Sequence, residues 1–177
     1  MARDINGHPV EVRGLRRFRR DRGAPELDPH DVTLTVLAGS TDPAVSSASV
    51  LAQAGDRVAA GEVEVVLRHL LVIAPDAVDE VVATAAQDHY VRVDHSRLDE
   101  PGPEPGPART DTDAGLEGFD PEVVADALNA TAGRVTLLLA RTQLIDAMHC
   151  SQERSRVAGL AARHNGDVVG WQILGRV

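Results

Sequence analysis

The clearest hydrophobic pattern lies near the end of the chain, where an apolar run, a helical pattern and a second apolar run follow one another. Residues 134–141 are rich in Leu and Val and too few to cross a membrane, which favours a strand buried on both faces. Residues 151–164 carry apolar positions at helical spacing, with Ser151 as the candidate N-cap. Residues 167–174 predict a final strand, in which Gly170 is a bulge or a point of close backbone approach.

A second strand, helix and strand are predicted earlier in the chain. Residues 62–73 form the most hydrophobic run, although Arg68 and His69 interrupt it at its centre. Pro75 then begins a helix with one apolar stripe, and residues 90–93 resume as a short strand.

Shorter elements lie on either side of this unit. Residues 32–38 alternate as a strand does, and a helix of small residues is expected from Asp42 to about Ala54. Asp120 and Pro121 begin another short helix. Residues 95–119 are dominated by Pro, Gly and acidic residues, which predicts an exposed, mobile linker. We therefore expect a flexible basic arm over 1–30 and one domain over 31–174, interrupted by this linker.

Two strand, helix, strand units predict an α+β fold of the ferredoxin-like split βαβ kind. Its core is expected to be a four-stranded antiparallel sheet with the helices on one face, to which an extra N-terminal strand and helix are added. A doubly wound parallel sheet is the main alternative. It ranks second because no phosphate-binding glycine turn follows any of the expected strands.

Composition narrows the functional classes. The chain has 177 residues, of which 43% are hydrophobic, and this is enough for a single core. A net charge of −9 disfavours a general nucleic-acid binder. All 18 basic residues are arginine, so Schiff-base and phosphate-loop lysine chemistry are excluded. The single cysteine excludes an intramolecular disulfide. Neither a secretory signal nor a membrane span is visible, and a cytoplasmic location is expected.

The sequence contains few candidate catalytic groups. His149 and Cys150 place a base beside a thiol, but neighbours in sequence do not face each other on a helix. His69, inside an apolar strand, is interpreted as a core or interface residue rather than a ligand. The other candidates for a metal cluster lack the spacing of known sites: His89, Asp94 and His95. We therefore expect neither enzymatic activity nor a metal or other cofactor.

Several short segments, spread over about residues 63–174, resemble the ribonuclease E inhibitor RraB family. The terminal motif shares only Gly170 and Trp171 with that family, and His89 stands where the family has glycine. The family resemblance implies a ferredoxin-like core and a small acidic protein that binds the endoribonuclease ribonuclease E and modulates RNA decay. The segments that carry it are 64–70, 89–93, 144–147, 160–164 and 166–171.

This resemblance implies a non-enzymatic regulator that acts through a surface. The candidate partner-binding residues are acidic positions at the start of a helix and the sole tryptophan: Asp76, Asp79, Glu80 and Trp171. Each has a simpler alternative. Acidic residues in a first helical turn are favoured by the helix dipole alone, and a single Trp beside glycine usually seals a sheet–helix interface.

Two other functions stay open. A ribosome- or RNA-associated factor would use the basic segment between Arg13 and Arg22, although a solvated arm is the simpler interpretation of that segment. An ACT-like small-molecule-sensing domain would share the fold class. The candidate nucleic-acid contacts are Arg16, Arg17, Arg19 and Arg20.

Overall fold

The computed structural model describes residues 26–93, 118–130 and 133–176. Most of the expected basic arm, including Arg16, Arg17, Arg19 and Arg20, lies outside the described residues. So do residues 94–117, which make up nearly all of the expected linker.

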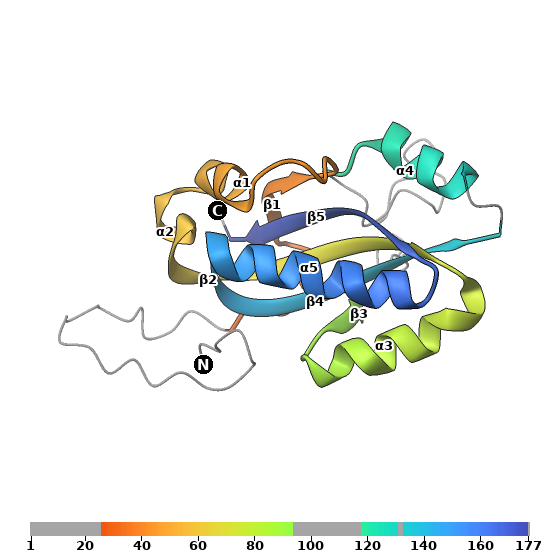
Figure 1. The fold of residues 1–177 in the computed structure, drawn as a ribbon. Coiled ribbons are helices and arrows are strands. Elements are labelled where there is room, and N and C mark those ends of the chain that lie inside the picture. Colours follow the sequence, from red (N-terminus) through yellow and green to blue (C-terminus); the bar gives the residue numbers. More distant parts are fainter. Residues whose placement is uncertain (1–25, 94–117, 131–132, 177) are drawn as a thin grey trace, which may run out of the picture.

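One antiparallel sheet of five strands organises the fold, in the order β1-β5-β2-β4-β3 (Figure 1). The predicted mixture of helices and strands is confirmed. The sheet has one strand more than the expected core of four, because the N-terminal strand pairs with the last one, from Thr35 opposite Gly175 to Ser40 opposite Trp171. The strands are β1 (Thr35–Ser40), β2 (Ala60–Ile73), β3 (Val91–Val93), β4 (Val135–Asp146) and β5 (Asp167–Gly175).

The strands of the two strand, helix, strand units are interleaved. A 3₁₀ turn, η1 (Pro75–Ala77), and α3 (Val78–Gln87) connect β2 to β3, while α5 (Ala147–Arg163) connects β4 to β5. In the sheet β4 lies between β2 and β3, and β2 lies between β4 and β5. Each unit therefore encloses one strand of the other, so the two strands of a unit are not neighbours in the sheet.

Side chains alternate between the two faces along each strand. Leu67 and Leu71 of β2 face α5 and α3, and α1 (Ser47–Gln53) and α2 (Asp56–Ala59) cover the same face. Leu70 and Val72 point to the opposite face, where α4 (Pro121–Asn129) packs. The strand β2 is buried on both faces, which explains its nearly continuous hydrophobic run.

The boundary between β4 and α5 differs from the prediction. We expected the strand to end at Arg141 and Ser151 to cap the helix. Instead β4 continues to Asp146, whose side chain accepts a hydrogen bond of 2.9 Å from the backbone N–H of His149. The strand continues because Arg141 and Gln143 stay paired with β2 and are buried, although their polarity ends the apolar run.

The helix expected from Asp42 also begins later. Ser46 is the N-cap of α1, and its hydroxyl accepts from the backbone N–H of Ser49 at 3.1 Å. Asp42 instead closes a turn by accepting from the backbone N–H of Ala44 at 2.8 Å. The loop between β1 and α1 is therefore longer than the sequence predicts.

Two residues that we assigned to flexible segments belong to the core. Leu27 is buried, and its carbonyl accepts a 2.8 Å hydrogen bond from the hydroxyl of Thr142 on β4. Phe119 is also buried and packs beside Gly170 of β5. The folded body thus begins before residue 31, and it includes Phe119, which we expected in the linker.

Candidate functional site

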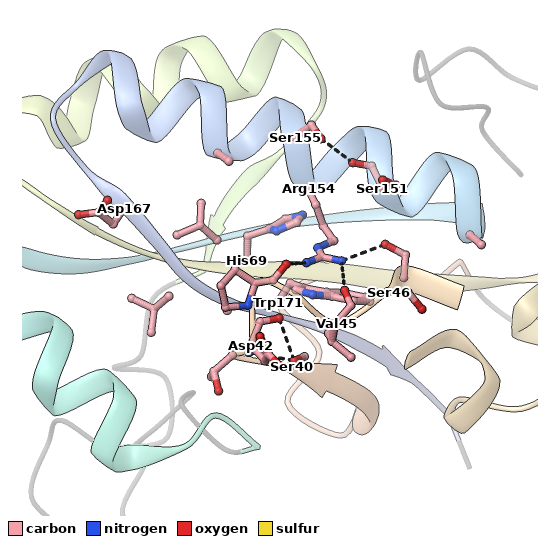
Figure 2. A pocket seen from close by; sticks show the side chains of 18 of the residues that line it. Ser40, Asp42, Val45, Ser46, His69, Ser151, Arg154, Ser155, Asp167 and Trp171 are labelled. Atoms are coloured by element: carbon pink, nitrogen blue, oxygen red, sulfur yellow. Dashed lines mark hydrogen bonds between the residues drawn. The ribbon is translucent and has the colours of Figure 1, made fainter. Parts of the chain in front are cut away.

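A cleft of about 780 Å³ opens between α5, the loop that joins β1 to α1, and β5 (Figure 2). Its volume lies in the range of about 300–1,000 Å³ that small-molecule sites occupy. His69 and Trp171, which are opposite each other across the β2–β5 pairing, are among its lining residues. The cleft is thus built where a buried strand pair meets a helix and a loop.

Arg154 of α5 crosses the cleft and holds the loop in place. One terminal guanidinium nitrogen donates to the carbonyl of Val45 at 3.0 Å and to the hydroxyl of Ser47 at 3.1 Å; the other donates to the carbonyl of Pro43 at 3.2 Å. The guanidinium carbon lies 5.1 Å from the centre of the Trp171 ring, which is cation–π geometry. All three hydrogen-bond acceptors are neutral. Within the described residues, no carboxylate lies within ion-pair distance of Arg154.

His69 is an uncharged imidazole in the core. It has no exposed surface, and burial, followed by the charges of Arg154 and Arg141, lowers its pKa to about 3. Its Nε2 lies 3.5 Å from the hydroxyl of Tyr90, which itself donates to Glu153 at 2.8 Å. Because the Tyr90 hydroxyl donates its proton to Glu153, it can only accept a hydrogen bond from His69. This contact therefore favours the tautomer with a proton on Nε2 and leaves Nδ1 as an acceptor. Nδ1 has no hydrogen-bond partner among the described residues.

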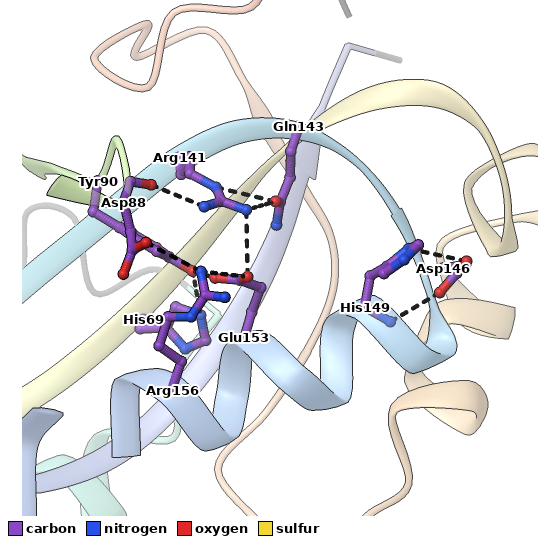
Figure 3. Close-up of polar contacts among 9 residues, drawn as sticks. All are labelled: His69, Asp88, Tyr90, Arg141, Gln143, Asp146, His149, Glu153 and Arg156. Atoms are coloured by element: carbon purple, nitrogen blue, oxygen red, sulfur yellow. Dashed lines mark hydrogen bonds and ion pairs between the residues drawn. The ribbon is translucent and has the colours of Figure 1, made fainter. Parts of the chain in front are cut away.

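Beside His69 lies a polar network, which we define as Tyr90, Arg141, Gln143, Glu153 and Arg156 (Figure 3). Glu153 is fully buried, and one of its oxygens lies 3.4 Å from Arg141 and 3.2 Å from Arg156. Arg141 also donates to the side chain of Gln143 and, at 2.8 Å, to the carbonyl of Asp88. Burial, followed by the charge of Glu153, raises the pKa of Tyr90 well above its usual value. These contacts tie α5 to β4 and to the turn before β3.

No sequence pattern marked Arg141, Glu153 or Arg154 as functional residues. A signal for Glu153 was present, because it lies three residues after Cys150 and four before Val157, on the apolar stripe of α5. A carboxylate on that stripe must be buried and needs a partner. That the partner is Arg141 depends on the pairing of distant elements.

The predicted partner-binding residues do not form one surface. Asp76, Asp79 and Glu80 are exposed at the start of α3 and its preceding turn, and Glu80 lies 3.8 Å from Nδ1 of His164. Trp171 is only 3% exposed and lies in the core beside the cleft. The structure therefore brings the three carboxylates together but separates the tryptophan from them.

The remaining candidates lack nucleophilic or metal-binding geometry. Burial raises the pKa of Cys150 to about 11, which keeps its thiol protonated at neutral pH. Its neighbour His149 instead lies with Nδ1 3.0 Å from the carboxylate of Asp146. No group of three or more His, Cys, Asp or Glu side chains that could hold a metal ion occurs within residues 26–93, 118–130 and 133–176.

Comparison with known proteins gives no family assignment. No family model, curated protein or solved structure matches the chain. In the part of the chain that the structure describes, no helix is both long enough and apolar enough to span a membrane.

Proposed function

We propose that this chain is a non-enzymatic regulatory protein that binds ribonuclease E, or a related component of RNA decay, through the acidic start of α3 and thereby modulates RNA cleavage. The observation that carries the proposal is the exposed group Asp76, Asp79 and Glu80. Asp76 and Asp79 have no ion-pair partner among the described residues. Unpaired carboxylates on a protein of net charge −9 attract an arginine- or lysine-rich partner and steer its approach.

The fold is compatible with this proposal. We propose that β2 to β5 form a ferredoxin-like core, because each strand, helix, strand unit encloses one strand of the other, as a split βαβ arrangement requires. The resemblance to the RraB family covers the same part of the chain and implies the same core. On this interpretation β1 and α1 are additions to the edge of that core, and the protein acts in the cytoplasm beside its partner.

Purified ribonuclease E and a reporter RNA provide the test. Added protein should bind the enzyme and slow cleavage, and the double variant Asp79→Asn/Glu80→Gln should bind more weakly. Exposed pairs contribute about 0.2–1 kcal/mol each, so the loss of two predicts a decrease of about 2- to 30-fold in affinity, most visible at low salt.

The matched control is Glu122→Gln/Asp126→Asn, which removes two carboxylates from α4 on the opposite face of the sheet. The control should bind as the original chain does. Unchanged cleavage at saturating protein, or equal weakening by both double variants, would contradict the proposed function.

Deletion of residues 1–25 separates this function from ribosome or RNA association through the arginine-rich arm. Modulation of ribonuclease E should survive the deletion. A nuclease-sensitive association with RNA that disappears with the arm would instead favour the second function.

A further inference from the structure

The cleft between α5 and the β1–α1 loop carries a positive charge that has no counter-ion among the described residues. Arg154 is half-buried there, and its three hydrogen bonds all go to neutral oxygens. A guanidinium has five N–H donors, so two donors remain for another group, and among the described residues the charge meets only the Trp171 ring and neutral oxygens. A carboxylate satisfies both through charge-assisted hydrogen bonds.

The charges around the cleft limit the ligand further. Arg154 is the only positively charged side chain among its described lining residues, since His69 is neutral, whereas the carboxylates of Asp42 and Asp167 both belong to the lining. Asp167 pairs with Arg134 at 2.8 Å, but Asp42 is exposed and has no ion-pair partner among the described residues. A ligand with two negative charges would meet one cation and an unpaired carboxylate. A ligand that carries one carboxylate and one positive group fits this distribution better.

Two residues near Arg154 carry buried polar atoms. Nδ1 of His69 is an acceptor, Nε1 of Trp171 is a donor, and both are buried without a hydrogen-bond partner among the described residues. Buried polar atoms without partners are uncommon in folded proteins. Both residues line the cleft, although these two atoms themselves have no solvent-accessible surface.

We propose that this cleft binds a small amino carboxylate, with its carboxylate on Arg154 and its ammonium group towards Asp42. The volume of about 780 Å³ accommodates a molecule of this size with room for a side chain. This site lies apart from the acidic start of α3 and does not depend on a ribonuclease partner.

The test uses Trp171, the only tryptophan in the chain, as the reporter. The full chain is titrated with each of the common L-amino acids while tryptophan fluorescence and the melting temperature are followed. At least one amino acid should give a saturable change in fluorescence and raise the melting temperature. Propionate and ethylamine, each of which carries only one of the two charges, should bind more weakly.

Variants of Arg154 then locate the carboxylate. Arg154→Gln should weaken binding about tenfold to a hundredfold, the usual effect of losing hydrogen bonds to a charged group. Arg154→Lys keeps the positive charge but not the paired N–H donors of the guanidinium, so its affinity for the amino acid should fall less. Arg163→Gln, on the same helix but outside the cleft lining, should bind as the original chain does.

The proposal is overturned if no amino acid gives a saturable signal at about ten millimolar. It is also overturned if Arg154→Gln and Arg154→Lys both bind the amino acid as tightly as the original chain. Circular dichroism of each variant confirms the fold before binding is measured, since Arg154 also holds the loop.

Discussion

The buried carboxylate of Glu153 gives the sharpest stability prediction. Its oxygens meet Arg141 at 3.4 Å, Arg156 at 3.2 Å and the hydroxyl of Tyr90 at 2.8 Å. Glu153→Gln keeps an acceptor for Tyr90 but removes the negative charge. Arg141 is only 3% exposed, so the variant removes a negative charge that lies 3.4 Å from a buried guanidinium. Breaking a buried ion pair in this way costs about 3–5 kcal/mol.

The free energy of unfolding is measured by urea titration and the melting temperature by circular dichroism. For a chain of this size each kcal/mol lowers the melting temperature by about 2–4 °C, so the expected decrease is about 6–20 °C. Asp126→Asn, an exposed carboxylate of α4 beyond its first turn, is the control and should change stability by less than about 0.5 kcal/mol. A similar small effect for Glu153→Gln would refute the assignment of a buried ion pair.

A double-mutant cycle tests whether the two charges act on each other. Arg141→Met combined with Glu153→Leu removes both charges from the core. The combined variant should lose less stability than the sum of the single variants, with a coupling of about 0.5–3 kcal/mol. Additive losses would show that Arg141 and Glu153 contribute separately.

Three further predictions concern single residues. His69 stays neutral in the folded chain down to a pKa of about 3, whereas the unfolded chain takes up its proton below about 6.5; the stabilisation is present above pH 6.5 and is lost as the pH falls. Between about pH 7.5 and 5, protonation of His69 in the unfolded chain should lower the free energy of unfolding by about 2 kcal/mol. Urea titrations at the two pH values measure this decrease, and in His69→Leu this contribution should be absent. Gly170→Ala should lower the free energy of unfolding by about 1–3 kcal/mol, because its Cβ would lie 3.0 Å from the Phe119 ring. Gly159→Ala should instead stabilise α5 by about 0.5–1 kcal/mol, because the nearest atom to its Cβ is 3.7 Å away. Thermal melts that rank the two variants in the opposite order would contradict this packing. Cys150, with its pKa raised to about 11, should react with iodoacetamide at neutral pH far more slowly in the folded chain than in urea, and equal rates would mean that the thiol is accessible.

Much of the fold could be predicted because its signals are local. The hydrophobic run of 62–73, the apolar stripe from Val78 to Ala85 and the run of 167–174 each reflect the period of one element, and all three elements are present. The predicted end of β4 at Arg141 was wrong, because polar residues interrupt the apolar pattern there while the strand continues to Asp146. Their burial depends on pairing with β2, which no local pattern reports.

The candidate site was less predictable. His69 and Trp171 were noticed, but their proximity across the β2–β5 pairing, with Arg154 over the indole, comes from segments far apart in the chain. A half-buried arginine in a sequence is indistinguishable from a solvated one until its surroundings are known. Trp171, a candidate partner-binding residue in the sequence, is buried in the core of the structure.

The sequence by itself determined the elements and their amphipathic faces, since periodicity, capping residues and breakers act over a few residues. It also excluded lysine chemistry and an internal disulfide. Only the tertiary structure decided the interleaved strand order, the partners of Glu153 and the cleft around Arg154. Those features depend on which distant surfaces meet, and it is burial against a particular neighbour that gives a polar side chain its pKa, its partner and its role.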